Sequence, residues 1–238
     1  AQNLPSSYLP IWLFFKIPIL IILGLISFPF VEKRIFSNKK NTMIIGSLLT
    51  TILTIIFLLI FFNTNLYDEI RQVMFLVPLI FIISLSSMYF FSKRLSFPLI
   101  LFFVFFFIFQ NIKIYPYNYT WLNNLTTLTK ISGVFELDYW GVSSKNVARF
   151  FNKMNLDQET CIISNRNNGI EAFTKDSNIC FLPFNNLHAN NKRPFYVVLM
   201  ERSTNKGLPN NCNNIHNEKI NINLSKENLI MAKIFKCD

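Results

Sequence analysis

A lysine lies inside the first long apolar run of the chain. Lys16 follows the start of that run, Ile11, by five residues, which is roughly 8 Å along a straight helix. An ammonium group at that depth in a bilayer is costly unless it snorkels to the interface or meets an anion. Both readings stay open, and the second would pair Lys16 with the phosphate of a lipid. Tyr8 and Trp12 are then either interfacial aromatics or part of a sugar or lipid site.

Aromatic residues and carboxylates are concentrated after the last apolar run. The group consists of Tyr115, Tyr117, Glu136, Asp138, Tyr139 and Trp140. Aromatic rings can stack on sugar rings while carboxylates accept hydrogen bonds from sugar hydroxyls. The alternative is an aromatic belt and the packed joint between a membrane part and a soluble part. We therefore regard these six residues as candidates for either sugar or acceptor binding or for the joint.

The four cysteines all lie in the second half of the chain, at Cys161, Cys180, Cys212 and Cys237. Four cysteines allow three pairings, and their spacing does not choose among them. Disulfides and buried free thiols are both open readings. Zinc is disfavoured because no Cys-x-x-Cys spacing occurs. No metal site and no cofactor are expected in this chain.

Four apolar runs precede these residues and predict transmembrane helices. They cover about residues 11–30, 43–62, 73–91 and 95–112. Each run has about the 18 to 20 residues that a helix needs to cross the hydrocarbon core. They lack the alternation of apolar and polar residues that a membrane barrel requires. The expected fold is an all-α membrane domain, residues 1–112, followed by a small extracytoplasmic α/β domain, residues 113–238.

Basic residues in the loops predict the orientation. Lys33, Arg34, Lys39 and Lys40 follow the first run, and Lys93 and Arg94 follow the third. The positive-inside rule places these two loops in the cytoplasm. The chain is then expected to be a multi-pass membrane protein. Its beginning and its whole C-terminal domain are expected on the outer side of the membrane.

The C-terminal domain is expected to combine one amphipathic helix with several short strands. The helix should begin at Ser143 or Ser144 and end near Asn155. Strands are predicted at 161–164, 179–184, 195–200 and 229–235. The net charge of +10 is spread over loops and tail. It forms no basic run interleaved with aromatics, so nucleic acid is not an expected partner.

Three segments carry a resemblance to a known family. They are Leu-Pro-Ser-Ser-Tyr-Leu-Pro-Ile-Trp-Leu with the Lys16-Ile-Pro that follows, Tyr-Pro-Tyr-Asn-Tyr-Thr-Trp-Leu-Asn, and Phe-Glu-Leu-Asp-Tyr-Trp-Gly-Val-Ser-Ser-Lys. Together they resemble the C-terminal half of bacterial polytopic glycosyltransferases of the GT-C class, relatives of protein mannosyltransferases. The resemblance is strongest at residues 136–143 and weakest after Asn155.

The resemblance implies sugar transfer from a polyprenyl-phosphate donor to a lipid, glycan or protein acceptor, on the outer face of the bacterial inner membrane. It implies that the catalytic carboxylate, and any divalent metal, belong to a loop upstream of Ala1. The start Ala-Gln-Asn, without Met or a signal-peptide pattern, also predicts that an upstream portion is missing. Lys16 and Tyr8 are the candidates for binding the donor phosphate.

A different class of function explains the topology equally well. A non-enzymatic four-span anchor would present a small external domain for binding or assembly, and it needs no upstream part. A transporter is disfavoured because no charge lies near the middle of any predicted span.

Overall fold

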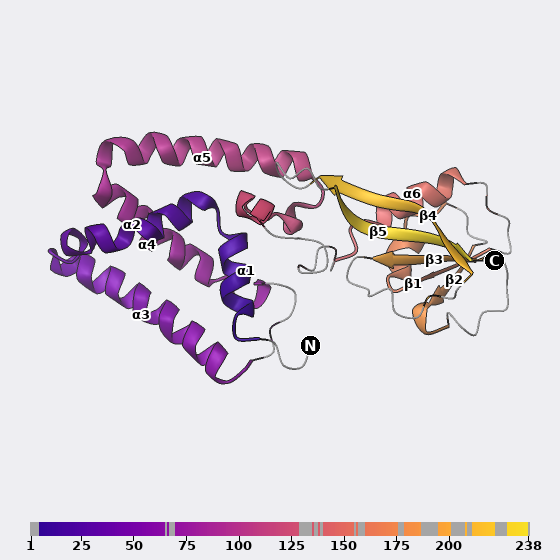
Figure 1. The fold of residues 1–238 in the computed structure, drawn as a ribbon, viewed down its shortest axis with the longest axis horizontal. Coiled ribbons are helices and arrows are strands. Elements are labelled where there is room, and N and C mark those ends of the chain that lie inside the picture. Colours follow the sequence, from indigo (N-terminus) through magenta and orange to yellow (C-terminus); the bar gives the residue numbers. More distant parts are fainter. Residues whose placement is uncertain are drawn as a thin grey trace. The chain divides into compact units, whose positions relative to one another are not determined.

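The chain divides into two compact units. A computed structural model describes residues 5–64, 66, 70–128, 135, 138, 140–154, 156, 160–175, 179–186, 195–200, 208, 211–221 and 228–237. The helical unit contains Ala1–Tyr115 and Trp121–Thr129, and the sheet unit contains Pro116–Thr120 and Lys130–Asp238. Figure 1 labels the helices of the first unit and the strands of the second.

The helical unit contains five long or apolar helices. They are α1 (Tyr8–Lys16), α2 (Ile19–Ile35), α3 (Lys39–Phe61), α4 (Leu76–Phe91) and α5 (Lys93–Ile114). By length and composition α3 and α5 can each cross a membrane, and α1 with α2 counts as a third span if the bent pair is taken together. These helices are compatible with a multi-pass membrane protein. The predicted span at 73–91 is not confirmed, because α4 has only 16 residues.

The prediction of one straight helix over 11–30 is wrong. Two helices occupy this run, and they are bent by 111° where α1 ends and α2 begins. The cause is Pro18, which has no backbone N–H and disfavours helical backbone at the residue before it. Ile17 accordingly adopts an extended conformation with φ −85° and ψ 134°. Lys16 therefore lies at a bend, and the depth of 8 Å calculated for a straight helix does not apply.

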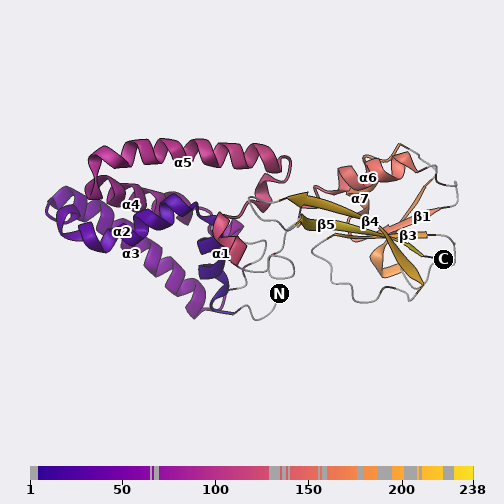
Figure 2. The same cartoon turned by 45° about the horizontal axis from the view of Figure 1, so that its top comes forward.

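Helices α2 and α4 pack closely through small residues. A Cβ atom on Gly24 would lie 2.0 Å from Ser84 Oγ, so the two backbones approach at this point. The Ser84 hydroxyl, which is buried, donates to the Ile21 carbonyl at 2.8 Å. Small residues and hydroxyl hydrogen bonds are the means by which membrane helices associate. Helix α5 is separate from α2 over most of its length in both views (Figures 1 and 2).

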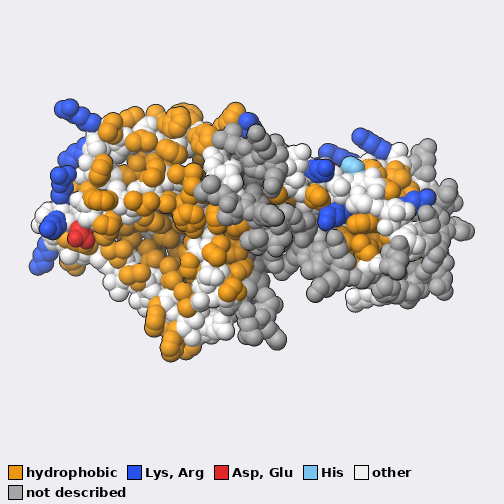
Figure 3. Space-filling model, in the orientation of Figure 1, with side chains coloured by type: hydrophobic (Ala, Val, Ile, Leu, Met, Phe, Trp, Pro, Cys, Tyr) orange, Lys and Arg blue, Asp and Glu red, His pale blue; other side chains and the backbone are white. Residues whose placement is uncertain are grey.

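Lysine and arginine side chains gather at one end of the helical unit. Figure 3 shows them around the connections from α2 to α3 and from α4 to α5, next to a broad hydrophobic flank. Arg34 Nη1 donates to the Phe90 carbonyl at 3.4 Å and so links the two connections. We call this region the basic end; it corresponds to the two loops that the positive-inside rule assigns to the cytoplasm.

Among the residues that the structure describes, the sheet unit contains a mixed five-stranded sheet and two α-helices. Its elements are α6 (Ser144–Lys153), β1 (Cys161–Ser164), α7 (Asn167–Glu171), β2 (Cys180–Pro183), β3 (Phe195–Met200), β4 (Cys212–Asn221) and β5 (Asn228–Cys237). The strand order is β2-β1-β3-β5-β4. Strand β1 pairs in parallel with β2 and β3, whereas β5 pairs antiparallel with β3 and β4. The predicted small α/β domain is confirmed, with β4 as an additional strand.

A single apolar face of α6 joins the core of this unit. Val147, Ala148 and Phe151 are buried, and they belong to a hydrophobic cluster with Ile162 of β1 and Val198 of β3. The helix therefore has the position and the amphipathic pattern expected from the sequence.

The four cysteines form two disulfides. Cys161 bonds to Cys180 across β1 and β2, and Cys212 bonds to Cys237 across β4 and β5. In both cases the two residues are direct partners in the strand register. Of the three pairings left open by the sequence, the sheet therefore selects the one that links adjacent strands.

Candidate functional site

An apolar cavity with a lysine at its rim lies between three helices of the helical unit. Its volume is about 300 Å³, and α2, α4 and α5 all contribute to its lining. Leu20, Phe81 and Phe103 represent these three helices, and Lys16 and Trp121 complete the lining. We call this cavity the donor cavity. Lys16 and Trp121 lie near the α1–α2 bend, at the opposite end of α2 from the basic end.

The position of Lys16 is set by the end of α1. Lys16 is the last residue of this helix, and its side chain is half-buried. Its Nζ atom lies 5.7 Å from the centroid of the Trp12 ring, within the range of a cation–π interaction. A cation beside an apolar cavity favours a ligand with a negative head and a hydrocarbon tail.

Asn123 stabilises the bend that holds Lys16. Its side-chain nitrogen donates to the carbonyls of Phe14 (2.6 Å) and Ile17 (2.8 Å). Its backbone N–H donates to the Phe15 carbonyl at 2.8 Å. In a continuous helix the backbone N–H of residue 18 would donate to the Phe14 carbonyl. Because Pro18 has no N–H, the Asn123 side chain supplies the missing donor.

A hydrogen-bonded chain of side chains borders the donor cavity next to Trp121. Trp121 Nε1 donates to Gln110 Oε1 at 3.1 Å, and Gln110 Nε2 donates to Asn124 Oδ1 at 2.9 Å. The Trp121 ring packs edge-on against Phe107 of α5, with centroids 4.9 Å apart. This network fixes the aromatic wall of the cavity.

The network was not predicted from the sequence. Gln110 was the one available signal, because it interrupts the Phe-rich run of α5 a turn before its end. Trp121 and Asn123 are part of the Tyr-Pro-Tyr-Asn-Tyr-Thr-Trp-Leu-Asn segment, but the candidates from that segment are only Tyr115 and Tyr117.

Tyr8 does not share the donor cavity with Lys16. It begins α1 and lines a separate, smaller cavity together with Leu9, Ile60 and Asn63. Eight residues of helix separate Tyr8 from Lys16, about 12 Å along the axis. Tyr115 follows the end of α5 with 78% of its surface exposed.

Asp138 is a buried carboxylate whose oxygens are already occupied. Only 1% of its surface is exposed. It accepts hydrogen bonds from the hydroxyls of Tyr119 and Ser143 and from the backbone N–H groups of Val142 (2.9 Å) and Ser143 (3.2 Å). These bonds attach the segment at Tyr119 to the start of α6. The geometry favours the structural reading of Asp138 over sugar binding.

Tyr117 is buried in the same unit and is part of a polar group. Asn146 Nδ2 donates to the Tyr117 hydroxyl oxygen at 3.0 Å and to Glu218 Oε1 at 2.7 Å. Burial raises the pKa of Tyr117, and the negative charges of Glu218 and Asp138 raise it further. Glu218 also lies 3.7 Å from Nε2 of His216. Tyr117 is thus a protonated core tyrosine.

The remaining candidates differ in accessibility. Trp140 is about half exposed, at 52%. Glu136 and Tyr139 lie outside the described residues. Within the described ranges, no group of three or more His, Cys, Asp or Glu side chains converges in a way that would hold a metal ion.

The donor cavity is thus an apolar space with a cation at one end. It combines helices far apart in the chain, and the segment at 121–124 completes its border. Comparisons with family models, with curated proteins and with solved structures give no match to this chain.

Proposed function

We propose that the chain is the C-terminal membrane part of a glycosyltransferase that moves a sugar from a polyprenyl-phosphate donor to an acceptor on the outer face of the membrane. The observation that carries this proposal is the donor cavity, with Lys16 at its rim. Its apolar lining suits a prenyl chain, and the ammonium group suits the phosphate.

The proposed chemistry assigns a defined role to Lys16. A carboxylate removes the proton from an acceptor hydroxyl, and the oxygen attacks the anomeric carbon of the donor sugar. The bond from that carbon to the phosphate oxygen breaks, and the polyprenyl phosphate leaves with the bonding electrons. The lysine ammonium stabilises the charge that develops on the phosphate. The proposal assigns the carboxylate to a segment outside this chain.

The test measures binding of polyprenyl phosphate to the chain in lipid nanodiscs. Lys16→Gln should weaken binding by roughly tenfold, because an ion contact near the membrane is worth about 1 kcal/mol or more. Lys113→Gln is the matched control. Lys113 lies in the last turn of α5, packs over the Phe109 ring at 4.4 Å and does not line the donor cavity.

We expect Lys16→Gln to bind polyprenyl phosphate more weakly than the unmodified chain. Lys113→Gln should bind it within twofold of the unmodified chain. Equal binding by all three proteins would overturn the proposed role of Lys16. The transferase reading itself needs a second measurement, sugar transfer by the full-length protein, in which Lys16→Gln should lower the rate.

A second candidate function is a non-enzymatic anchor that presents the sheet unit. The observation that favours it is the lining of the donor cavity, which contains no carboxylate among its described residues. An anchor has no need for a lipid phosphate, so absence of any polyprenyl-phosphate binding would favour this alternative.

A further inference from the structure

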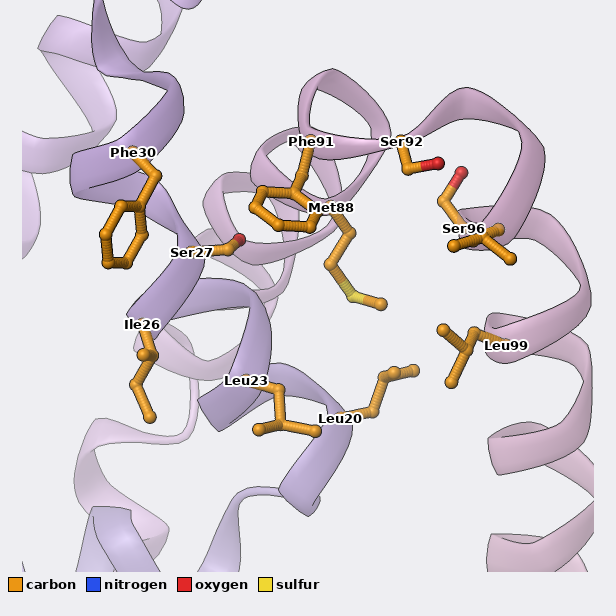
Figure 4. A pocket seen from close by; sticks show the side chains of 11 residues that line it. Leu20, Leu23, Ile26, Ser27, Phe30, Met88, Phe91, Ser92, Ser96 and Leu99 are labelled. Carbon is orange, nitrogen blue, oxygen red and sulfur yellow. The ribbon is translucent and has the colours of Figure 1, made fainter.

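A second apolar cavity extends along α2 from Leu20 toward the basic end of the helical unit. Its volume is about 330 Å³, and it lies between α2, the end of α4 and the beginning of α5. Figure 4 shows Leu20, Leu23, Met88 and Leu99 around the open space between these helices. Leu20 is shared with the donor cavity, whereas the other lining residues extend toward the α4–α5 turn.

Basic residues lie close in sequence to residues that line this second cavity. Lys93 and Arg94 come directly after Ser92, which lines the cavity. Lys93 Nζ lies 5.3 Å from the Tyr89 ring centroid. Arg34 is four residues beyond the lining residue Phe30, and its bond to the Phe90 carbonyl holds it against the end of α4.

The charge of the basic end is strongly unbalanced. It contains six lysine and arginine residues at the ends of α2, α3 and α5, Lys33, Arg34, Lys39, Lys40, Lys93 and Arg94. Its acidic residue is Glu32, so the formal charge of the basic end is +5, six positive charges less one. A ligand here must supply negative charge.

The surroundings of the cavity point to a ligand from the bilayer. Phe30 and Phe91 line the cavity and are 76% and 59% exposed, so the rim is itself apolar. A small soluble anion gains nothing from such a space, and the chains of a lipid do. Cations at the interface and hydrocarbon-lined space directly beneath them match the two parts of a phospholipid.

We propose that this second cavity binds one acyl chain of an anionic phospholipid from the leaflet at the basic end, with the headgroup on Lys93, Arg94 and Arg34. This site is distinct from the donor cavity, because the two linings share only Leu20, and this one extends along α2 as far as Phe30 and uses other cations. The bound lipid fills the space between α5 and the α2–α4 pair and so holds α5 in place.

The test uses native mass spectrometry of the full chain released from membranes of equal phosphatidylglycerol and phosphatidylcholine content. The unmodified chain should retain phosphatidylglycerol in preference. Lys93→Gln with Arg94→Gln should lower that preference by roughly ten- to thirtyfold, since each cation near the surface contributes about 1 kcal/mol. The matched control, Lys39→Gln with Lys40→Gln, removes the same charge from α3, which does not line this cavity.

A second pair of variants tests the cavity separately from the charge. Leu23→Trp fills the space and should reduce the number of retained lipids, whereas Leu53→Trp on α3, at an exposed position, should not. Circular dichroism of each variant checks that the helices are intact.

Four results would overturn this site. One is equal retention of the two lipids by the unmodified chain. Another is an equal effect of the α3 control variants, which would indicate general surface attraction. The third is loss of phosphatidylglycerol from Lys16→Gln, which would assign the lipid to the donor cavity. Competition by glycerol phosphate alone would also contradict a site that needs the acyl chain.

Discussion

Asn123 acts as a helix cap supplied from a distant part of the chain. The carbonyls of Phe14 and Ile17 have lost their helical partners at the bend, and the Asn123 side chain is the donor for both. In apolar surroundings an unsatisfied carbonyl costs about 1–3 kcal/mol. The side chain therefore stabilises the bend far more than a surface asparagine would.

We expect Asn123→Asp to destabilise the helical unit by about 2–4 kcal/mol, because it keeps the size of the side chain and removes both donors. The measurement is helical circular dichroism during thermal unfolding in detergent. Asn111→Ala is the control, since Asn111 is exposed and donates to the Phe107 carbonyl of its own helix. A loss of similar size in both variants would contradict the capping role.

Tyr117 should make the sheet unit sensitive to alkaline pH. Its pKa is raised in the folded state, so above about pH 10 the unfolded chain loses this proton while the folded chain keeps it. The contribution of Tyr117 to the free energy of unfolding is therefore fully present at neutral pH. It falls as the pH rises past about 10, by roughly 1.4 kcal/mol per pH unit.

Tyr117→Phe removes the titrating hydroxyl. It should abolish the part of the stability loss at alkaline pH that comes from Tyr117. The measurement compares urea unfolding at pH 8 and pH 11 for the unmodified chain and the variant. Tyr115→Phe, which alters an exposed tyrosine, should retain the loss. An identical pH dependence in all three proteins would contradict this assignment.

The sequence singles out Lys16 as a candidate but not the residues that surround it. A cation in an apolar run is visible in one dimension, so Lys16 was identified as a candidate. Trp121, which lines the same cavity, and its hydrogen-bond partner Gln110 could not be found, because they come together only when residues 121–124 return to the helical unit. Tyr8 was grouped with Lys16 because they are near in sequence, yet they lie at opposite ends of α1 and line different cavities.

The contact between α2 and α4 depends on a glycine. Gly24→Ala would put a methyl group within 2.0 Å of Ser84 Oγ and 2.7 Å of its carbonyl oxygen. The two helices must then move apart, and we expect a loss of about 1–3 kcal/mol.

Gly46→Ala on α3 is the matched control for this element. A Cβ atom at Gly46 meets nothing within 4 Å, so the better helix propensity of alanine should stabilise α3 by up to about 1 kcal/mol. Thermal unfolding of both variants in detergent tests the pair. Equal effects of the two substitutions would indicate that α2 and α4 do not pack through Gly24.

The elements were predictable where the pattern was simple. The runs at 161–164 and 195–200 are short, apolar and β-rich, and both are strands with those bounds. Strand β4 was missed because Cys-Asn-Asn-Ile-His-Asn-Glu-Lys-Ile-Asn is polar and rich in a turn-forming residue. It lies at the edge of the sheet, where exposed polar side chains are tolerated, so only its pairing with β5 identifies it as a strand.

For the molecule as a whole, the disulfides distinguish the two units. Both lie in the sheet unit, at sequence separations of 19 and 25. Each should contribute about 3 kcal/mol by restricting the unfolded chain. A reductant should therefore lower the melting temperature of the sheet unit and leave that of the helical unit unchanged.

Differential scanning calorimetry of the full chain, with and without reductant, tests this expectation. The double variant Cys161→Ala with Cys180→Ala lacks one of the two disulfides. Without reductant, it should show part of the same decrease in the melting temperature of the sheet unit. A transition of the sheet unit that is insensitive to both treatments would contradict a stabilising role of the two bonds.

The strand order also constrains the synthesis of the protein. Strand β5 lies between β3 and β4 although it follows both in the chain. The apolar strand β3, Phe-Tyr-Val-Val-Leu-Met, therefore has one unpaired edge until Asn228 and the residues after it have been made. At about 5–20 residues per second, the ribosome needs roughly one to six seconds for this interval. During those seconds the nascent chain presents an aggregation-prone edge, which makes binding by a chaperone advantageous.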